Sequence, residues 1–237
     1  MCYGVTVTAA MAAAGVVAAA VTARRGDPVA VPLTLAWFAL MEMLQLAGWL
    51  VVDGCGTPVN ETVTFLSMLH ILVQPLFINA FAMELAPRPV SAPMRLAVFG
   101  LCGVAATVGL MQVYPFAWAG ACTPGAILCG PTLCTVSGDW HIAWNVPYNG
   151  LLTWADRLTG LNWGFYGYML AVFGLPLLYG AWRFTLFHAL AGPLLASRLT
   201  TNPNEMPAIW CLFSIGLLLM GLSPALRRRV AARPRPA

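Results

Sequence analysis

Apolar residues run along the chain in seven blocks, separated by short polar segments that contain glycine, proline or charged residues. Each block approaches the length of about 20 residues that an α-helix needs to span a bilayer. We therefore predict an all-α, polytopic integral membrane protein that folds as a seven-transmembrane-helix bundle. The predicted helices cover residues 4–23, 31–52, 62–84, 96–113, 164–180, 183–199 and 206–222. No basic residue precedes the first block, so we interpret it as a retained helix and not as a signal peptide.

The longest connection, residues 114–162, is expected to form a structured loop on the outer face. Leu151, Ala155 and Leu158 fall on one helical face in this loop and Asp156 falls on the opposite face. This pattern predicts a short helix that lies in the membrane interface, with the leucines facing the bilayer.

Charge is scarce and unevenly distributed. Charged residues make up 8% of the chain, against about 25% in soluble domains, which excludes a water-soluble domain. All basic residues are arginine, and the absence of lysine excludes a retinal Schiff base. If the N-terminus is outside, all arginines except Arg157 and Arg198 lie in cytoplasmic segments. Cytoplasmic segments of membrane proteins carry an excess of arginine, so this distribution predicts an outer N-terminus and a cytoplasmic C-terminus. The basic segment 226–237 is predicted to be a disordered cytoplasmic tail.

The net charge of +4 follows from this topology. Anionic lipid headgroups suffice as its partner. We therefore expect the lipid bilayer, and no nucleic acid, to be the partner of the basic side.

Polar side chains inside the apolar blocks form narrow stripes at helical spacing. Glu42 shares a helix face with Gln45, and His188 shares one with Thr185. A third stripe consists of Ser67, His70 and Gln74. Ionisable groups at mid-membrane are costly and must face protein or water. We expect Glu42, His70 and His188 to converge on one buried site.

Carboxylate and imidazole are the ligands of a catalytic zinc. The first hypothesis is therefore a metal-dependent intramembrane hydrolase acting on a lipid, with Glu42, His70 and His188 as metal ligands and catalytic groups. Ser67 or Gln74 would then orient water or an oxyanion. A haem held between His70 and His188 is a weaker alternative.

Two non-enzymatic hypotheses remain open. In one, the same pocket binds a small apolar ligand or lipid, with Glu42 and Gln45 as its few orienting polar groups. In the other, the polar stripes hold the helices in register, and the protein is a structural subunit of a membrane assembly.

Seven helices with an outer N-terminus, a buried acid and intramembrane histidines are similar in outline to the alkaline-ceramidase and adiponectin-receptor class of membrane hydrolases. The last predicted helix, residues 206–222, has no histidine. The H-x-x-x-H pair that such enzymes carry there has no counterpart, so no residue assignment follows from the resemblance.

Four cysteines lie in predicted outer segments: Cys55, Cys122, Cys129 and Cys134. They predict two disulfides, for which three pairings are possible. The chain is therefore expected in a bacterial inner membrane or another membrane that faces an oxidising compartment. His141, between two tryptophans of the long loop, is interpreted as a hydrogen-bonded interfacial residue or as a further ligand.

Overall fold

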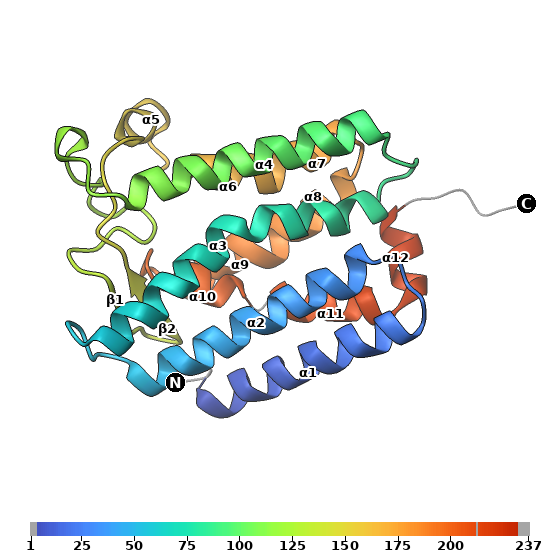
Figure 1. Ribbon diagram of the computed structural model, residues 1–237, viewed down its shortest axis with the longest axis horizontal. Helices are drawn as coiled ribbons and strands as arrows, with labels where there is room; N and C mark the ends of the chain where they lie inside the picture. The colour runs from blue at the N-terminus through green and yellow to red at the C-terminus, as the bar shows by residue number, and fades with distance from the viewer. Residues whose placement is uncertain (1–3, 212, 232–237) are drawn as a thin grey trace, which may run out of the picture.

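Four long helices make up the first half of the chain: α1 (Val5–Arg24), α2 (Ala30–Val51), α3 (Pro58–Glu84) and α4 (Ala92–Val113). In the computed structural model, which describes residues 4–211 and 213–231, each helix runs antiparallel to the next (Figure 1). All four are long and apolar enough to cross a membrane. The first four predicted helices are therefore confirmed, with ends displaced by a few residues.

Local sequence signals mark where these helices turn. Gly26 adopts a positive φ of 70° directly after the first helix, a conformation that glycine reaches without steric cost. The Thr57 side chain accepts a hydrogen bond from the backbone N–H of Asn60 (3.4 Å), and Pro58 occupies the first helical position. Gly15 packs against Ala39, where an added Cβ would lie 2.8 Å from the alanine Cβ, so α1 and α2 approach closely.

The helices of the second half are interrupted. The first run consists of α6 (Tyr166–Met169), the π-helical turn η2 (Leu170–Gly174) and α7 (Leu175–Leu178). The second consists of α8 (Trp182–Ala189), the π-helical turn η3 (Leu190–Leu194) and α9 (Leu195–Leu199). The third consists of α10 (Met206–Trp210), α11 (Phe213–Leu222) and α12 (Pro224–Ala231).

The seven-span prediction is therefore not confirmed. Within the described residues, four helices are long and apolar enough to cross a membrane, or five if Met206–Leu222 and Pro224–Ala231, bent by 102°, count as one span. Hydropathy records side-chain composition but not helix continuity. Pro176 and Pro193 lack the N–H that a continuing helix requires, and each lies in or beside a π-helical turn.

Asn79 compensates one of these interruptions. A π turn would pair the Ala171 carbonyl with the backbone N–H of residue 176, which is a proline and has none. The fully buried Asn79 side chain donates to this carbonyl through Nδ2 (2.9 Å), and its Oδ1 accepts from the Tyr179 hydroxyl (2.8 Å). The amide thereby fastens α3 to the first interrupted run.

Residues between α4 and α6 form a cap at one end of the bundle (Figure 1). The cap contains η1 (Ala117–Ala119), β1 (Cys134–Ser137), β2 (Ile142–Asn145) and α5 (Thr153–Thr159). The two strands pair antiparallel, with Cys134 opposite Asn145. Disulfides join Cys55 to Cys134 and Cys122 to Cys129. These findings confirm the two predicted disulfides and select one of the three pairings.

The short helix α5 turns Asp156 toward the protein and Leu158 outward. Asp156 is 3% exposed, whereas Leu158 is 78% exposed. The Asp156 carboxylate accepts hydrogen bonds from the Thr123 hydroxyl (2.9 Å), the Tyr166 hydroxyl (2.9 Å) and the Gly164 backbone N–H (3.4 Å). A buried carboxylate with three donors is favourable, so these hydrogen bonds hold the Asp156 face of α5 against the protein.

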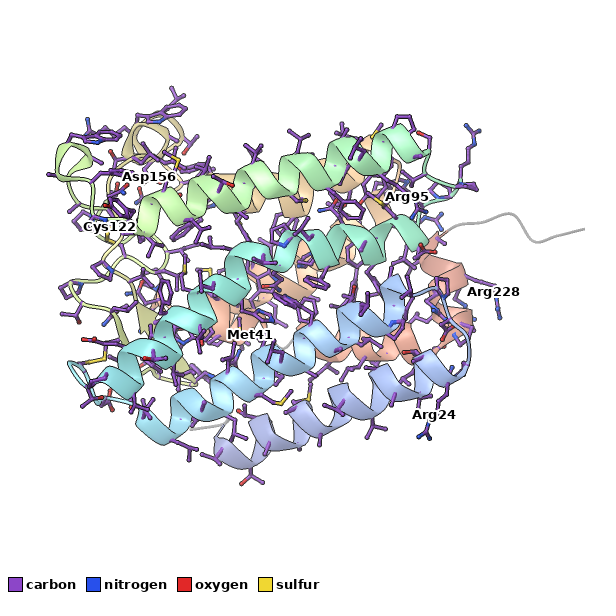
Figure 2. The ribbon with its side chains drawn as sticks, in the orientation of Figure 1. Arg24, Met41, Arg95, Cys122, Asp156 and Arg228 are labelled. Carbon is purple, nitrogen blue, oxygen red and sulfur yellow. A yellow bond between two sulfur atoms is a disulfide. The ribbon has the colours of Figure 1, made fainter. Side chains whose placement is uncertain are left out.

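Arginines gather at the end of the bundle opposite the cap. Arg24, Arg95 and Arg228 lie at one end, whereas Cys122 and Asp156 lie at the other (Figure 2). Arg227 pairs with Asp27 (2.6 Å), which joins α12 to the α1–α2 turn. Residues 226–231 were expected to be disordered, but they belong to the helix α12. Residues 232–237 of the predicted tail lie outside the described residues.

Candidate functional site

His70 of α3 is buried against Trp37 of α2. Its Nε2 donates to the backbone carbonyl of Trp37 (2.8 Å), and its ring stacks on the Trp37 ring at a centroid distance of 4.2 Å. Phe77 stacks on the same indole at 4.1 Å. His70 thus links two neighbouring helices.

Ser67, predicted to orient water, donates to the Val63 carbonyl of its own helix (2.9 Å). Its side chain is fully buried. The hydroxyl therefore bonds one turn back within α3.

His188 of α8 lies in an aromatic box. Trp210 Nε1 donates to His188 Nε2 (3.2 Å), and the rings of Phe173, Phe184 and Trp210 lie at centroid distances of 5.0, 5.7 and 5.5 Å. The indole itself packs against Gly192, where an added Cβ would lie only 2.2 Å from Trp210 Nε1. The absence of a Cβ at Gly192 therefore leaves room for the indole beside His188.

Glu42 and Gln45 share one face of α2, as predicted, and both are buried. They line a small chamber of about 20 Å³ together with His141 of the cap and Cys211 at the end of α10. His70 and His188 are not among its lining residues. The predicted convergence of Glu42, His70 and His188 is absent from this chamber.

No zinc site is found either. Across residues 4–211 and 213–231, no three His, Cys, Asp or Glu side chains are arranged to hold a metal ion. The Nε2 atoms of His70 and His188 are each hydrogen-bonded to protein. The haem alternative would require both of these bonds to break.

His141 is a buried residue of the cap, 5% exposed. Its Nδ1 accepts from the backbone N–H of Ile142 (2.8 Å), and its ring packs on Trp49 of α2 at 5.4 Å. Burial lowers the pKa of His141 to about 4, although the charge of Glu205 opposes this shift. The ring is therefore neutral at physiological pH.

Glu205 docks the cap onto the second half of the chain. Its fully buried carboxylate accepts from the backbone N–H groups of Trp140 and His141 and from the Thr200 hydroxyl (2.6 Å). The backbone N–H of Trp144 donates to the Asn204 carbonyl (3.0 Å). The turn before α10 and the cap therefore form one hydrogen-bonded unit.

An apolar cavity of about 50 Å³ lies between this cap and the bundle. Its walls come from α2, α3, α6, α10 and the cap, with Met41 near the middle of the bundle (Figure 2). Gln74 contributes the single amide side chain to an otherwise largely apolar and aromatic lining. The remaining lining residues are Phe38, Met41, Ile71, Leu72, Ile127, Leu128, Trp163, Phe165, Tyr168, Met169, Met206, Pro207, Trp210 and Cys211.

A groove of about 650 Å³ adjoins this cavity. It runs along the two interrupted helical runs and includes residues of both π-helical turns, among them Gly174 and Pro193. Four residues line both spaces: Ile127, Trp163, Met169 and Met206. The cavity and the groove are therefore neighbours separated by these side chains.

Sequence reasoning identified Gln74 of this apolar site, through the polar stripe of α3, but not the cavity around it. Most of the other lining residues are apolar or aromatic and do not stand out in an apolar block. One signal was available: Gly174 with Pro176, and Gly192 with Pro193, mark the places where the helices are interrupted and the groove forms.

The chain belongs to a protein family, the Family of unknown function (DUF5765), whose model matches residues 6–231. The matched residues include the cap, the lining of the apolar cavity and the lining of the groove. No curated protein and no solved structure matches the chain. Its apolar helices and two disulfides are compatible with a membrane protein that faces an oxidising compartment.

Proposed function

We propose that this protein is an integral membrane protein that binds one acyl chain of a lipid, or a similarly slender apolar molecule, in the cavity beneath the cap. The observation that carries the proposal is the shared lining of the cavity and the groove by Ile127, Trp163, Met169 and Met206. A movement of these side chains joins the two spaces into one path from the outside of the bundle to its interior.

The sizes of the two spaces select the ligand class. A cavity of about 50 Å³ accommodates the end of a chain but no bulky ring system. The groove of about 650 Å³ has room for the rest of such a molecule. Because hydrocarbon tails in the bilayer are already in an apolar medium, binding depends on shape and van der Waals packing and not on the hydrophobic effect. Gln74 offers a hydrogen bond to a carbonyl or hydroxyl group that reaches the cavity.

Orientation in the membrane follows from the charges. The arginines labelled in Figure 2 lie opposite the cap, and cytoplasmic loops carry an excess of arginine. In our proposal the disulfide-linked cap faces the oxidising side and α12 faces the cytoplasm. The ligand then enters from the outer leaflet, because the groove includes cap residues such as Gly125 and Asn162.

Photo-crosslinking tests the proposal. The purified protein in nanodiscs is incubated with a fatty acid that carries a diazirine near its chain end, irradiated, digested and mapped by mass spectrometry. We expect labelling concentrated on cap and α6 peptides that contain Trp163 and Met169. Met169→Trp fills the shared wall and should reduce this labelling several-fold.

The matched control is Leu101→Trp, which adds the same indole to a half-exposed position of α4, outside both spaces. It should leave the labelling of the cap and α6 unchanged. Labelling spread evenly over all lipid-facing helices, or unaffected by Met169→Trp in folded protein, would overturn the proposal.

A further inference from the structure

The chamber beside Glu42 lies on the other side of Cys211 from the apolar cavity, because Cys211 lines both spaces. At about 20 Å³ it is too small for an organic ligand. A cavity needs about 10–15 Å³ to hold a water molecule, so the chamber has room for one. Its polar lining groups come from α1, α2, the cap and the end of α10: Thr8, Glu42, Gln45, His141 and Cys211.

Gln45 gives the evidence for an occupant. Its side chain is 1% exposed and adjoins the sulfur of Cys211, which is a weak acceptor, and within the described part of the chain its Nε2 has no nitrogen or oxygen partner. A buried donor left unsatisfied costs about 1–3 kcal/mol. A water molecule in the chamber can accept from this amide and satisfy it.

Glu42 determines what else such a water can do. Its carboxylate lines the same chamber, one helical turn before Gln45, and is 6% exposed in the middle of a candidate membrane span. Ionisable side chains at this depth are costly and occur where they serve a purpose. Carboxyl groups with bound water are the parts from which proton-binding sites in membrane proteins are built.

We propose that the chamber binds one water molecule between Gln45 and Glu42, and that Glu42 takes up and releases a proton through this water. On uptake, a hydronium ion of the medium loses a proton, which passes over the bound water to a Glu42 carboxylate oxygen. On release the same proton returns, so no other reactant is needed.

His141 supplies the side of the chamber nearest the cap. Its Nδ1 accepts from the Ile142 backbone N–H, so the neutral ring carries its proton on Nε2. Among the described lining residues, the titratable groups beside Glu42 are His141 and Cys211. Val7, Met11, Ala208 and Ile215 complete the lining.

Infrared difference spectroscopy on the full chain in nanodiscs tests the inference. Spectra recorded between high and low pH should contain the C=O stretch of one protonated carboxyl group that is absent in Glu42→Gln. Exchange of H₂O for H₂¹⁸O should shift an O–H band of weakly hydrogen-bonded water in the same spectra. The matched control is Glu84→Gln, which removes an inner-end carboxylate that contacts Arg95 (3.9 Å) and should retain both bands.

Gln45→Met provides the second variant, because methionine keeps the volume of glutamine and removes the amide donor. It should abolish the water band and displace the carboxyl band, and this result holds even where Glu42→Gln does not fold. A carboxyl band that persists in Glu42→Gln, or a water band unchanged in folded Gln45→Met, would overturn the inference. Neither measurement uses a lipid probe, so the result is independent of the proposed acyl-chain binding.

Discussion

The two halves of the chain differ in the continuity of their helices. Residues 4–113 form four uninterrupted helices that satisfy their own backbone hydrogen bonds. Residues 114–211 and 213–231 form the cap and three helical runs; the first two are interrupted at the π-helical turns η2 and η3, and the third bends by 102° before α12. Irregular backbone at membrane depth is tolerated only where it is buried in protein or lines a cavity.

The cavities lie where these two halves meet. From the first half, α2 and α3 line the apolar cavity, and α1 and α2 line the chamber beside Glu42. The cap and the interrupted runs line the other sides of both. The groove is lined by the second half alone. The groove is therefore a feature of the second half, whereas the enclosed cavity and the chamber need walls from both halves.

The largest effect should come from the disulfide that joins the halves. Cys55 and Cys134 are separated by 79 residues, so their bond restricts the unfolded chain over a long loop. Removing it by Cys55→Ala with Cys134→Ala should lower the free energy of unfolding by about 4 kcal/mol. Removal of Cys122–Cys129, separated by 7 residues, should cost less. Denaturant unfolding in detergent measures both changes in the free energy of unfolding. Equal losses would contradict the expectation that the disulfide between the two halves stabilises the fold more than the one within the cap.

A second effect concerns pH and the cap. His141 has its pKa lowered to about 4 by burial, so the unfolded chain binds a proton at higher pH than the folded one. The contribution of neutral His141 to the free energy of unfolding is fully present above the pKa of histidine in the unfolded chain, about 6.5, and is lost as the pH falls through the folded-state pKa of about 4. The loss should reach about 3 kcal/mol. His141→Asn should flatten this part of the stability profile, measured by unfolding at stepwise pH; a profile identical to that of the wild type would refute the assignment.

A smaller effect should distinguish glycines of the two halves. Gly192→Ala places a Cβ against the Trp210 indole and should cost about 1–3 kcal/mol by overpacking. Gly103→Ala, in the middle of α4, meets no atom within 4 Å and should change stability by less than about 1 kcal/mol, in the stabilising direction. Thermal unfolding of the pair tests whether irregular backbone is required in the second half, and equal melting temperatures would argue against it.

The helices of the first half were predictable because each apolar block there forms one continuous helix, so the length of the block gives the length of the helix. Pro75 lies inside α3 without ending it. The second half was not, because hydropathy treats Gly192 and Pro193 as two more tolerated residues, while the backbone turns there. The four outer cysteines were predicted to be bonded, but their pairing depends on the position of β1 beside the α2–α3 turn.

The site was predictable only within single helices. Glu42 and Gln45 share a face because their spacing on α2 dictates it. Which helix that face meets is a property of packing, and Cys211 and His141 come from distant parts of the sequence. His70 and His188 show the same limit, since each hydrogen-bonds to a tryptophan residue, Trp37 or Trp210, that no helical stripe identifies.

The long disulfide also bears on the order of biosynthesis. Ribosomes release Cys55 first, followed by Cys122 and Cys129, and Cys134 only afterwards. The native partner of Cys55 is therefore the last of these thiols to emerge, and two wrong partners precede it. Closure of the short Cys122–Cys129 ring removes both competitors at once, and thiol–disulfide exchange corrects a pairing that forms before it.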